Sequence, residues 1–368
     1  MTELSYRIFL AIVVNMRHIQ YSIYYSAVNI TQPARIVKGV TLLTECGVML
    51  QSLCLTFPTL TRKVGYIFDM IIDFHVHVSR PEHEHPWAMD FMQSQFDGDI
   101  VEFAERVLTP EGIRSHLQEN GIDFAVALAE VCPITTGTCS NEYTIDFVRR
   151  ANSVPDPSEG PKGRLIPFAS PNPYIDNDLA ERVDALVQGE GFRGIKLYPV
   201  YQHHYLNDTR MYPMYAKAQE LGIPILVHTG SSVFKGARIK YGDPLHLDDV
   251  AIDFPDLNLL LAHGGRPFWY EQAFWMAQRH SNVFLEISGL PAKNLLTYFP
   301  KLERLAEKVV YGSDWPGYPY IRRNIDVIYD LPIGEQAKEM ILGGNAAKLL
   351  GLQSDIAAQQ SVSQERAQ

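Results

Sequence analysis

The chain has 368 residues, of which 46% are hydrophobic and 20% are charged, a composition ordinary for a folded globular protein. Its formal net charge of −10 argues against nucleic acid as a partner, because phosphate binding needs basic patches. No run approaches the ~18 apolar residues that a membrane span needs. The four cysteines have neither zinc-ribbon nor disulfide-framework spacing, which indicates a reducing, cytoplasmic compartment.

Residues 1–69 differ from the rest of the chain. They carry six basic and three acidic side chains, and their apolar residues follow no clear period. The run Ile8–Val14 resembles the apolar core of a signal peptide, but the flank before it has one acidic and one basic residue and no small-residue cleavage site follows closely, so we do not expect export. Met70 stands immediately before the first convincing strand. We therefore expect residues 1–69 to be a non-conforming extension and Met70 to be the true start.

The first predicted strand carries two histidines two residues apart. Side chains at i and i+2 of a strand share one face, so we expect His75 and His77 to point the same way. The apolar Phe74, Val76 and Val78 should then occupy the opposite face. Two neighbouring imidazoles make half of a metal site.

From Met70 to Leu352, short apolar runs alternate with longer amphipathic runs. Eight strands are predicted, over residues 71–78, 124–131, 165–169, 194–198, 225–228, 259–263, 283–287 and 309–313. Helical patterns cover residues 110–120, 142–152, 176–188, 211–221, 247–253, 270–279, 295–306, 321–329 and 335–350. Eight β–α repeats favour a single α/β domain, a (β/α)8 TIM barrel over residues 70–352. A doubly wound open sheet is the alternative, weakened because no Gly-x-Gly-x-x-Gly opens a helix.

Two segments lie outside this alternation. The connection after the first strand, residues 79–109, is long and rich in aromatic and acidic residues, and we expect it to form a lid or a substrate wall. It contains His83 and His85, which in a polar loop are expected to be solvated rather than bound to metal. Residues 353–368 are rich in Gln, Ser and Ala and are expected to be a flexible tail.

Chemically active side chains stand at the ends of several predicted strands. They are His75 and His77, Lys196, His228, His263, Glu286 followed by Ser288, and Asp314. Strand ends converge at the mouth of a barrel, so these side chains should meet in one pocket. Each of them alone could equally be a hydrogen-bonded core residue or a helix cap. Their recurrence at the same point of successive repeats favours a shared site.

These residues resemble the motifs of the amidohydrolase superfamily, specifically its amidohydrolase-2 or aminocarboxymuconate-semialdehyde-decarboxylase-like group. The motifs are, in order, Asp-Phe-His75-Val-His77, Gly-Ile-Lys196-Leu-Tyr-Pro, Val-His228-Thr-Gly, Ala-His263-Gly-Gly, Gly-Ser-Asp314-Trp-Pro and a closing Gly344-Asn-Ala-Ala-Lys-Leu-Leu-Gly351. The resemblance covers Met70 to about Leu352, and residues 1–69 have no counterpart in it.

The resemblance implies that His75, His77, His228 and Asp314 hold one divalent metal ion. Three imidazoles, one carboxylate and an open position suit Zn²⁺ first, with Mn²⁺ or Fe²⁺ as alternatives. The ion would lower the pKa of a water towards ~7, and Asp314 would hold or accept that water's proton. His263 resembles the family histidine that acts as an acid–base group or polarises the substrate, and it is not counted as a ligand.

Three further residues are candidates for substrate binding. Lys196 is expected to bind a substrate carboxylate as a free ammonium. A carboxylated lysine that bridges two metals and a structural pair with Glu286 are the alternatives. Arg266 could clamp a carboxylate through two hydrogen bonds, or form a structural ion pair at the barrel edge. Trp269 could face a ring of the substrate.

One position departs from the family pattern. The family often has a histidine two residues after the lysine of the fourth strand, where this chain has Tyr198. That difference argues against a second histidine at this strand. His203 and His204 lie in the following loop and are expected to be exposed to solvent.

Three functions are compatible with these residues. The first is a metal-dependent hydrolase that uses a metal-activated water on an amide or lactone of a small, carboxylated molecule, with the metal and His263 stabilising the oxyanion. The second is a decarboxylase of a small aromatic or enoic acid on the same site. The third is a non-catalytic barrel, which would be expected to lack one or more of the metal-binding residues. The partner is a small-molecule substrate, and a homodimer is possible by resemblance.

Overall fold

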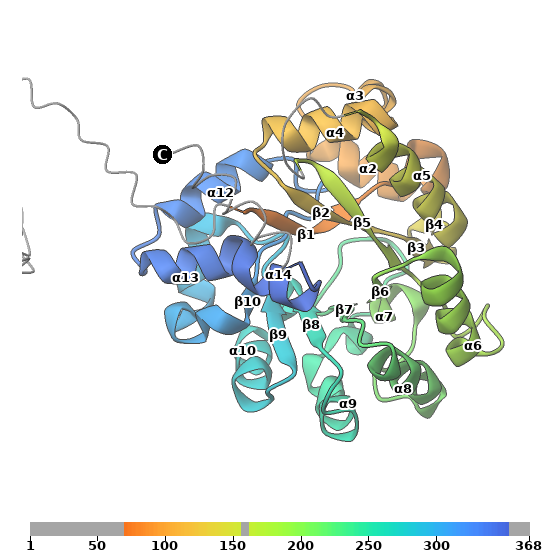
Figure 1. Cartoon of the computed structure of the whole chain (residues 1–368), viewed down its shortest axis with the longest axis vertical. Coiled ribbons are helices and arrows are strands. Elements are labelled where there is room, and N and C mark those ends of the chain that lie inside the picture. Colours follow the sequence, from red (N-terminus) through yellow and green to blue (C-terminus); the bar gives the residue numbers. More distant parts are fainter. Residues whose placement is uncertain (1–69, 156–161, 353–368) are drawn as a thin grey trace, which may run out of the picture. The chain divides into compact units, whose positions relative to one another are not determined.

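The computed structural model describes residues 70–155 and 162–352, so the predictions for residues 1–69 and 353–368 lie outside the described residues. Within the described ranges, eight strands form one sheet in which all neighbours are parallel. Their order is β1 (Ile72–His77), β2 (Phe124–Leu128), β5 (Arg164–Ala169), β6 (Gly194–Leu197), β7 (Ile225–His228), β8 (Leu259–Ala262), β9 (Val283–Glu286) and β10 (Val309–Val310). Figure 1 shows the helices around the outside of these strands. The predicted (β/α)8 barrel is confirmed.

The helices match most of the amphipathic patterns. They are α2 (Pro86–Ser94), α3 (Ile100–Val107), α4 (Pro110–Glu119), α5 (Asn141–Ser153), α6 (Leu179–Asp184), α7 (Pro199–Gln202), α8 (Tyr212–Glu220), α9 (Leu247–Asp253), α10 (Tyr270–Arg279), α11 (Leu295–Tyr298), α12 (Ile321–Tyr329), α13 (Glu335–Glu339) and α14 (Asn345–Leu349). None of the helices in the described part of the chain is long and apolar enough to cross a membrane.

The first and last strands close the barrel through backbone hydrogen bonds. The Phe74 amide donates to the Tyr311 carbonyl at 3.0 Å, and the His77 amide donates to the Trp315 carbonyl at 2.8 Å. In the opposite direction, the Asp314 amide donates to the His75 carbonyl at 3.0 Å. The segment after β10 therefore runs along β1, which brings Asp314 beside the two histidines.

Strand β1 contains a bulge that decides where its side chains point. Asp73 lies opposite Ala125 and Val76 lies opposite Ala127, so β1 has one more residue than β2 between these pairs. A bulge re-aims the side chains that follow it. The Asp73 carboxylate accepts from the His75 amide at 3.1 Å within this bulge.

The prediction that Phe74 faces away from the two histidines is wrong. Phe74 packs edge-on against Phe168 with 5.4 Å between ring centroids, in the cluster inside the barrel, which also contains Ile72. Val76 and Val78 belong to the other cluster, between strands and helices. Ile72 and Phe74 therefore follow the normal alternation, and the bulge turns the residues after Phe74, so that His75 and His77 also face inward.

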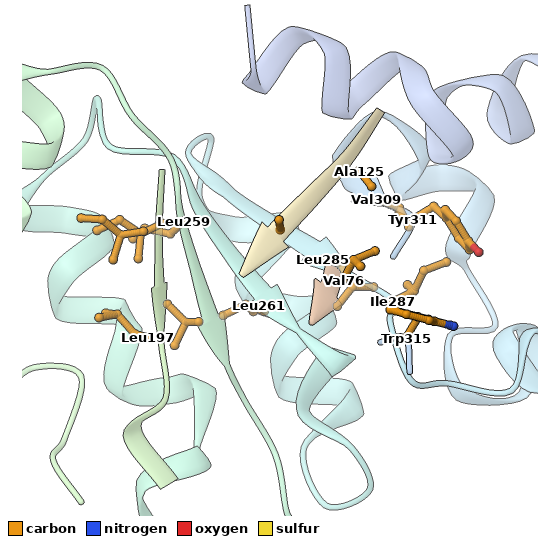
Figure 2. Packing of buried hydrophobic residues seen from close by; sticks show 14 of the residues in the cluster. Val76, Ala125, Leu197, Leu259, Leu261, Leu285, Ile287, Val309, Tyr311 and Trp315 are labelled. Carbon is orange, nitrogen blue, oxygen red and sulfur yellow. The ribbon is translucent and has the colours of Figure 1, made fainter. Parts of the chain in front are cut away.

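Two apolar clusters hold the barrel together. The interior cluster contains strand residues such as Phe124, Val126 and Leu260, and residues of α14 pack against one end of it. The larger cluster joins the outward faces of the strands to the surrounding helices; Figure 2 shows part of it, including Leu197 and Leu259.

The interior also depends on a glycine. Gly194 begins β6, and a Cβ added there would overlap the ring of Phe168. The small residue at this strand end lets Phe168 fill the barrel interior beside Phe74.

Replacing Ile225 with valine tests the outer cluster. Ile225 is on β7, and its side chain is fully buried in the cluster between the strands and the helices. Deleting one methylene there is expected to lower the free energy of unfolding by about 1 kcal/mol. The matched control is Ile252→Val on α9, where the side chain is 54% exposed and a change below about 0.5 kcal/mol is expected. Equal shifts of the denaturant midpoint for both variants would contradict this packing.

The long connection after β1 is partly helical, which its composition did not predict. It forms α2 and α3, each begun by a residue in extended conformation; Asp99 caps α3 by accepting from the Val101 amide at 2.7 Å. Beside it, β3 (Glu130–Cys132) and β4 (Gly137–Cys139) form an antiparallel hairpin. The predicted second strand, which extended to Val131, therefore ends at Leu128.

Candidate metal centre

Most of the predicted site residues line one cavity at the carboxyl ends of the strands. The cavity has a volume of about 440 Å³, and its walls include His75, His77, His228, His263 and Asp314. The two β1 histidines enter from the strand that carries the bulge, and His228 ends β7. His263 and Asp314 follow β8 and β10, and both have positive φ angles, 65° and 68°. Such backbone strain is typical of functional positions.

The distances within the cavity suit a single metal ion. Asp314 Oδ1 lies 3.4 Å from His75 Nε2 and 3.5 Å from His77 Nε2. Two ligand atoms about 2.1 Å from a tetrahedral ion are roughly 3.4 Å apart. One nitrogen of His263 joins this group, since its ligand atom, that of His75 and that of Asp314 all lie within 4.8 Å of one another. Imidazoles and one carboxylate are the donor set that Zn²⁺, Mn²⁺ or Fe²⁺ binds.

His228 was expected to be a metal ligand, but both of its ring nitrogens contact other groups of the protein. Its Nε2 lies 3.3 Å from the Ser231 carbonyl, and its Nδ1 lies 3.2 Å from His263 Nε2. His263, expected to be a non-ligand, is therefore in the compact group with His75 and Asp314, whereas His228 lies next to it. Which of the two occupies the fourth ligand position stays a prediction.

Most of the histidines are in the neutral state that metal binding needs. Burial, together with the positive charge of Lys196, holds the pKa of His75 and His228 well below the usual value. Burial and Arg266 do the same to the pKa of His263. A neutral imidazole has one nitrogen lone pair available for a cation.

His77 and Asp314 form the charged part of the site. Burial lowers the pKa of His77, but Asp314 and Glu130 outweigh burial and raise it to about 9. Burial raises the pKa of Asp314, but His263 and His77 outweigh burial and hold it well below the usual range. Asp314 is therefore an anion at neutral pH, and in the metal-free protein it faces a protonated His77.

Two glutamates hold the outer nitrogens of the β1 histidines. Glu130 Oε2 lies 3.2 Å from His77 Nδ1, and Glu130 also accepts from the Thr136 hydroxyl. Glu286 Oε2 lies 3.3 Å from His75 Nδ1. Carboxylates in this position fix the tautomer of a metal-binding histidine and orient its ring. Sequence reasoning missed Glu130, although its place directly after the second strand was the available signal.

Arg266 forms an ion pair with Asp314 within the site, and its two expected roles stay predictions. Its guanidinium lies 3.4 Å from Asp314 Oδ2 and donates to the Gly289 carbonyl at 2.8 Å. Gly289 makes this approach possible, because a Cβ there would overlap both Arg266 and Asp314. Arg266 also lines the cavity, so it is placed to meet a substrate as well.

Lys196 and Trp269 are not among the residues that line the cavity; Tyr198 and Tyr270 are. Lys196 is fully buried, with Nζ 3.5 Å from His75 Nε2. Burial lowers its pKa to about 8, against the opposing effect of Glu286 and Asp314. Lys196 and Trp269 as substrate-binding residues stay predictions.

The other histidines lie apart from this group. His204 was expected to be exposed, and this is wrong: it is 1% exposed, with Nε2 3.2 Å from Gln202 Oε1. His203 is half-buried and contacts the Gly236 carbonyl through Nε2 at 2.9 Å. His83 contacts the Arg80 amide, and His85 contacts the Pro133 carbonyl at 2.8 Å, so each has a structural contact in the connection.

Comparisons with known proteins agree with this architecture. The family model described as "Amidohydrolase" matches residues 72–352. A curated protein, 2-keto-4-carboxy-3-hexenedioate hydratase from Sphingobium sp. (strain NBRC 103272 / SYK-6), is 24% identical over 217 residues, or 49% of this chain. The match covers 62% of that hydratase, which is less than two thirds of its length.

Solved structures share the fold at low identity. An uncharacterised TIM-barrel protein from Bordetella bronchiseptica has a TM-score of 0.61 at 24% identity, over 78% of this chain and 99% of that one. A 4-oxalomesaconate hydratase from Rhodopseudomonas palustris has a TM-score of 0.54 at 21% identity, over 80% and 100%. A 2,6-dihydroxybenzoate decarboxylase from Rhizobium has a TM-score of 0.53 at 19% identity, over 77% and 99%.

Proposed function

The chain belongs to the amidohydrolase family, and from this premise we propose that it is a metal-dependent hydrolase of an amide or lactone in a small, carboxylated molecule. The observation that carries the proposal is the position of Asp314. Its Oδ1 faces the Nε2 atoms of His75 and His77, while its Oδ2 lies 3.8 Å from His263 Nδ1 and 3.4 Å from Arg266.

We assign His75, His77, His228 and Asp314 as the residues that hold one divalent ion, Zn²⁺ in the first place. The order of the family motifs supports this set, and the charge balance supports it too, because three imidazoles and one carboxylate leave a net positive ion. When bound, the ion would polarise an oxygen of water or substrate and lower the pKa of that water. Substitution distinguishes the role of His228 from that of His263. The His228→Ala protein should lose the metal, whereas the His263→Ala protein should retain the metal and lose turnover.

The chain's own residues then have separate roles in hydrolysis. Asp314 Oδ2 accepts the proton of the attacking water, whose oxygen bonds to the carbonyl carbon. That proton passes to the amine or alkoxide that leaves when the C–N or C–O bond breaks. Arg266 holds Asp314 in place from the opposite side and offers positive charge to an anionic substrate. Tyr201 and Phe234, which pack at 5.9 Å between centroids, give the cavity an apolar wall.

A decarboxylase is the second candidate, because the same fold carries a 2,6-dihydroxybenzoate decarboxylase. The test incubates metal-loaded protein with a panel of lactones, amides, hydroxybenzoates and unsaturated dicarboxylates, and follows acid release together with carbon dioxide. Acid release without carbon dioxide is expected. Carbon dioxide without hydrolysis would establish the decarboxylase, and addition of water to a double bond without cleavage would favour a hydratase like the curated relative. Either result would overturn the proposal.

Metal binding is expected to expel a proton at neutral pH. The pKa of His77 in the metal-free protein is about 9, so this ring is protonated at pH 7 and must lose its proton to become a ligand. Affinity should therefore rise about tenfold per pH unit up to pH 9 and level off above it. Calorimetric titration with Zn²⁺ in buffers of different ionisation enthalpy should detect about one proton released per ion at pH 7. Affinity independent of pH between 7 and 9 would contradict His77 as a ligand.

A further inference from the structure

Ser288 connects three strands at the base of the cavity. It lies two residues after Glu286, the last residue of β9, and is fully buried. Its Oγ lies 2.8 Å from Nδ1 of His75 on β1 and 3.0 Å from Nδ1 of His263 after β8. A third contact joins the same Oγ to Glu286 Oε2 at 2.8 Å. One hydroxyl thus contacts two histidines of the candidate centre and a carboxylate.

The number of protons available to this group settles its hydrogen-bond directions. A hydroxyl has one proton to donate and two lone pairs that accept. The Ser288 hydroxyl donates its proton to Glu286 Oε2. The two lone pairs of Oγ then accept from His75 and His263, which must each carry their proton on Nδ1.

A backbone contact requires the same proton position on His263 independently. His263 Nδ1 lies 3.1 Å from the Ser288 carbonyl, and a carbonyl can only accept. His75 Nδ1 also lies 3.3 Å from Glu286 Oε2. These contacts place a proton on Nδ1 of each ring, so Nε2 is the only ring nitrogen that can offer a lone pair.

We propose that Ser288 is a positioning residue that holds His75 and His263 in the Nδ1-protonated form, so that Nε2 of His75 is left for the metal position. His75 Nε2 lies 3.4 Å from Asp314 Oδ1, and His263 Nε2 lies 3.2 Å from His228 Nδ1. The role in metal binding rests on the proposed function, whereas the proton positions do not.

The first test measures the proton positions directly in metal-free protein. Nitrogen-15 NMR of histidine-labelled protein distinguishes protonated from unprotonated ring nitrogens, and His75→Gln and His263→Gln assign the two signals. A protonated Nδ1 is expected for both rings. An unprotonated Nδ1 in either ring would overturn the inference. Because no metal or substrate is involved, this result is independent of whether the protein proves to be a hydrolase.

The second test measures the effect of the hydroxyl on metal binding. Ser288→Ala should lower Zn²⁺ affinity about tenfold in a chelator competition, and Ser288→Thr, which keeps a hydroxyl, should restore most of it. The matched control is Ser170→Ala: Ser170 is a fully buried serine after β5 whose hydroxyl accepts from the Val131 amide, and its removal should leave Zn²⁺ affinity unchanged.

The outcomes of the two tests separate the inference from the proposed function. Ser288→Ala with unchanged Zn²⁺ affinity and unchanged ring signals would overturn the inference. Expected ring signals and a tenfold loss of affinity, in a protein that hydrolyses nothing in the panel, would overturn the proposed function and leave Ser288 as a positioning residue. If the Ser288→Ala protein does not fold, the nitrogen-15 spectrum of the wild type still tests the proton positions on His75 and His263.

Discussion

Replacing Asp314 with asparagine is expected to lower kcat/KM on the order of a thousandfold or more. Asparagine keeps the shape of the side chain but removes the negative charge that faces His75 and His77 through Oδ1 and Arg266 through Oδ2. The variant loses both a metal ligand and the proton acceptor for water. Steady-state kinetics on any substrate found in the panel, with metal content measured on the same sample, tests this.

The matched control is Asp326→Asn on α12. Asp326 is 53% exposed and pairs with Arg322 one helical turn away at 2.9 Å. Exposed pairs of this kind contribute little to stability, so kcat/KM should stay within about twofold. Full activity in the Asp314 variant would exclude Asp314 from the catalytic centre.

Replacing Lys196 with methionine is expected to have the largest effect on stability. The ammonium is fully buried, and the pKa of Lys196 responds to Glu286, Asp314 and Glu130. Methionine fills similar space without charge and leaves Glu286, the carboxylate with the largest effect on the pKa of Lys196, without this positive partner, so we expect the free energy of unfolding to fall by about 3–5 kcal/mol. Denaturant unfolding of the metal-free protein measures this change in free energy. The control is Lys301→Met, at an exposed lysine.

A second substitution separates the roles considered for Lys196. If the lysine mainly neutralises Glu286, then Glu286→Gln should cost much less in the Lys196→Met background than in the wild type. If Lys196 instead binds a substrate carboxylate, its loss should raise KM with little change in unfolding. Additive effects of the two substitutions on stability would contradict the structural pair.

The barrel and the strand positions could be predicted because the signal repeats. Each strand is a short apolar run that ends at a polar residue, and eight repeats leave little choice of architecture. The same logic brought His75, His228 and Asp314 to one cavity. Elements that depend on local periodicity, such as α5 and α12, also appeared within one or two residues of their predicted ends.

What could not be predicted depends on contacts between distant segments. The β1 bulge is held by Asp73, whose carboxylate also accepts from the Ser313 amide, 240 residues away, at 2.8 Å. The bulge turns His75 to the same side as Phe74, against the alternation of an ideal strand. Glu130 becomes a partner of His77 only because the β3–β4 hairpin folds beside the cavity. His204 is buried by its loop, which has no periodic pattern.

The pairing of histidines with acceptors was also beyond sequence reasoning. Glu286 and Ser288 were recognised as polar residues at a strand end, but their spacing does not tell which histidine they contact. Only the assembled barrel shows that one hydroxyl lies between His75 and His263.

The central claim is that the barrel mouth binds one divalent ion through His75, His77 and Asp314 together with a further histidine. The most direct measurement is the metal content of the purified chain by mass spectrometry, after loading with Zn²⁺ and removal of the excess. We predict about one ion per chain in the wild type and almost none in His77→Ala, with both proteins folded. A wild type without bound metal, or a His77→Ala variant that retains it, would contradict the account.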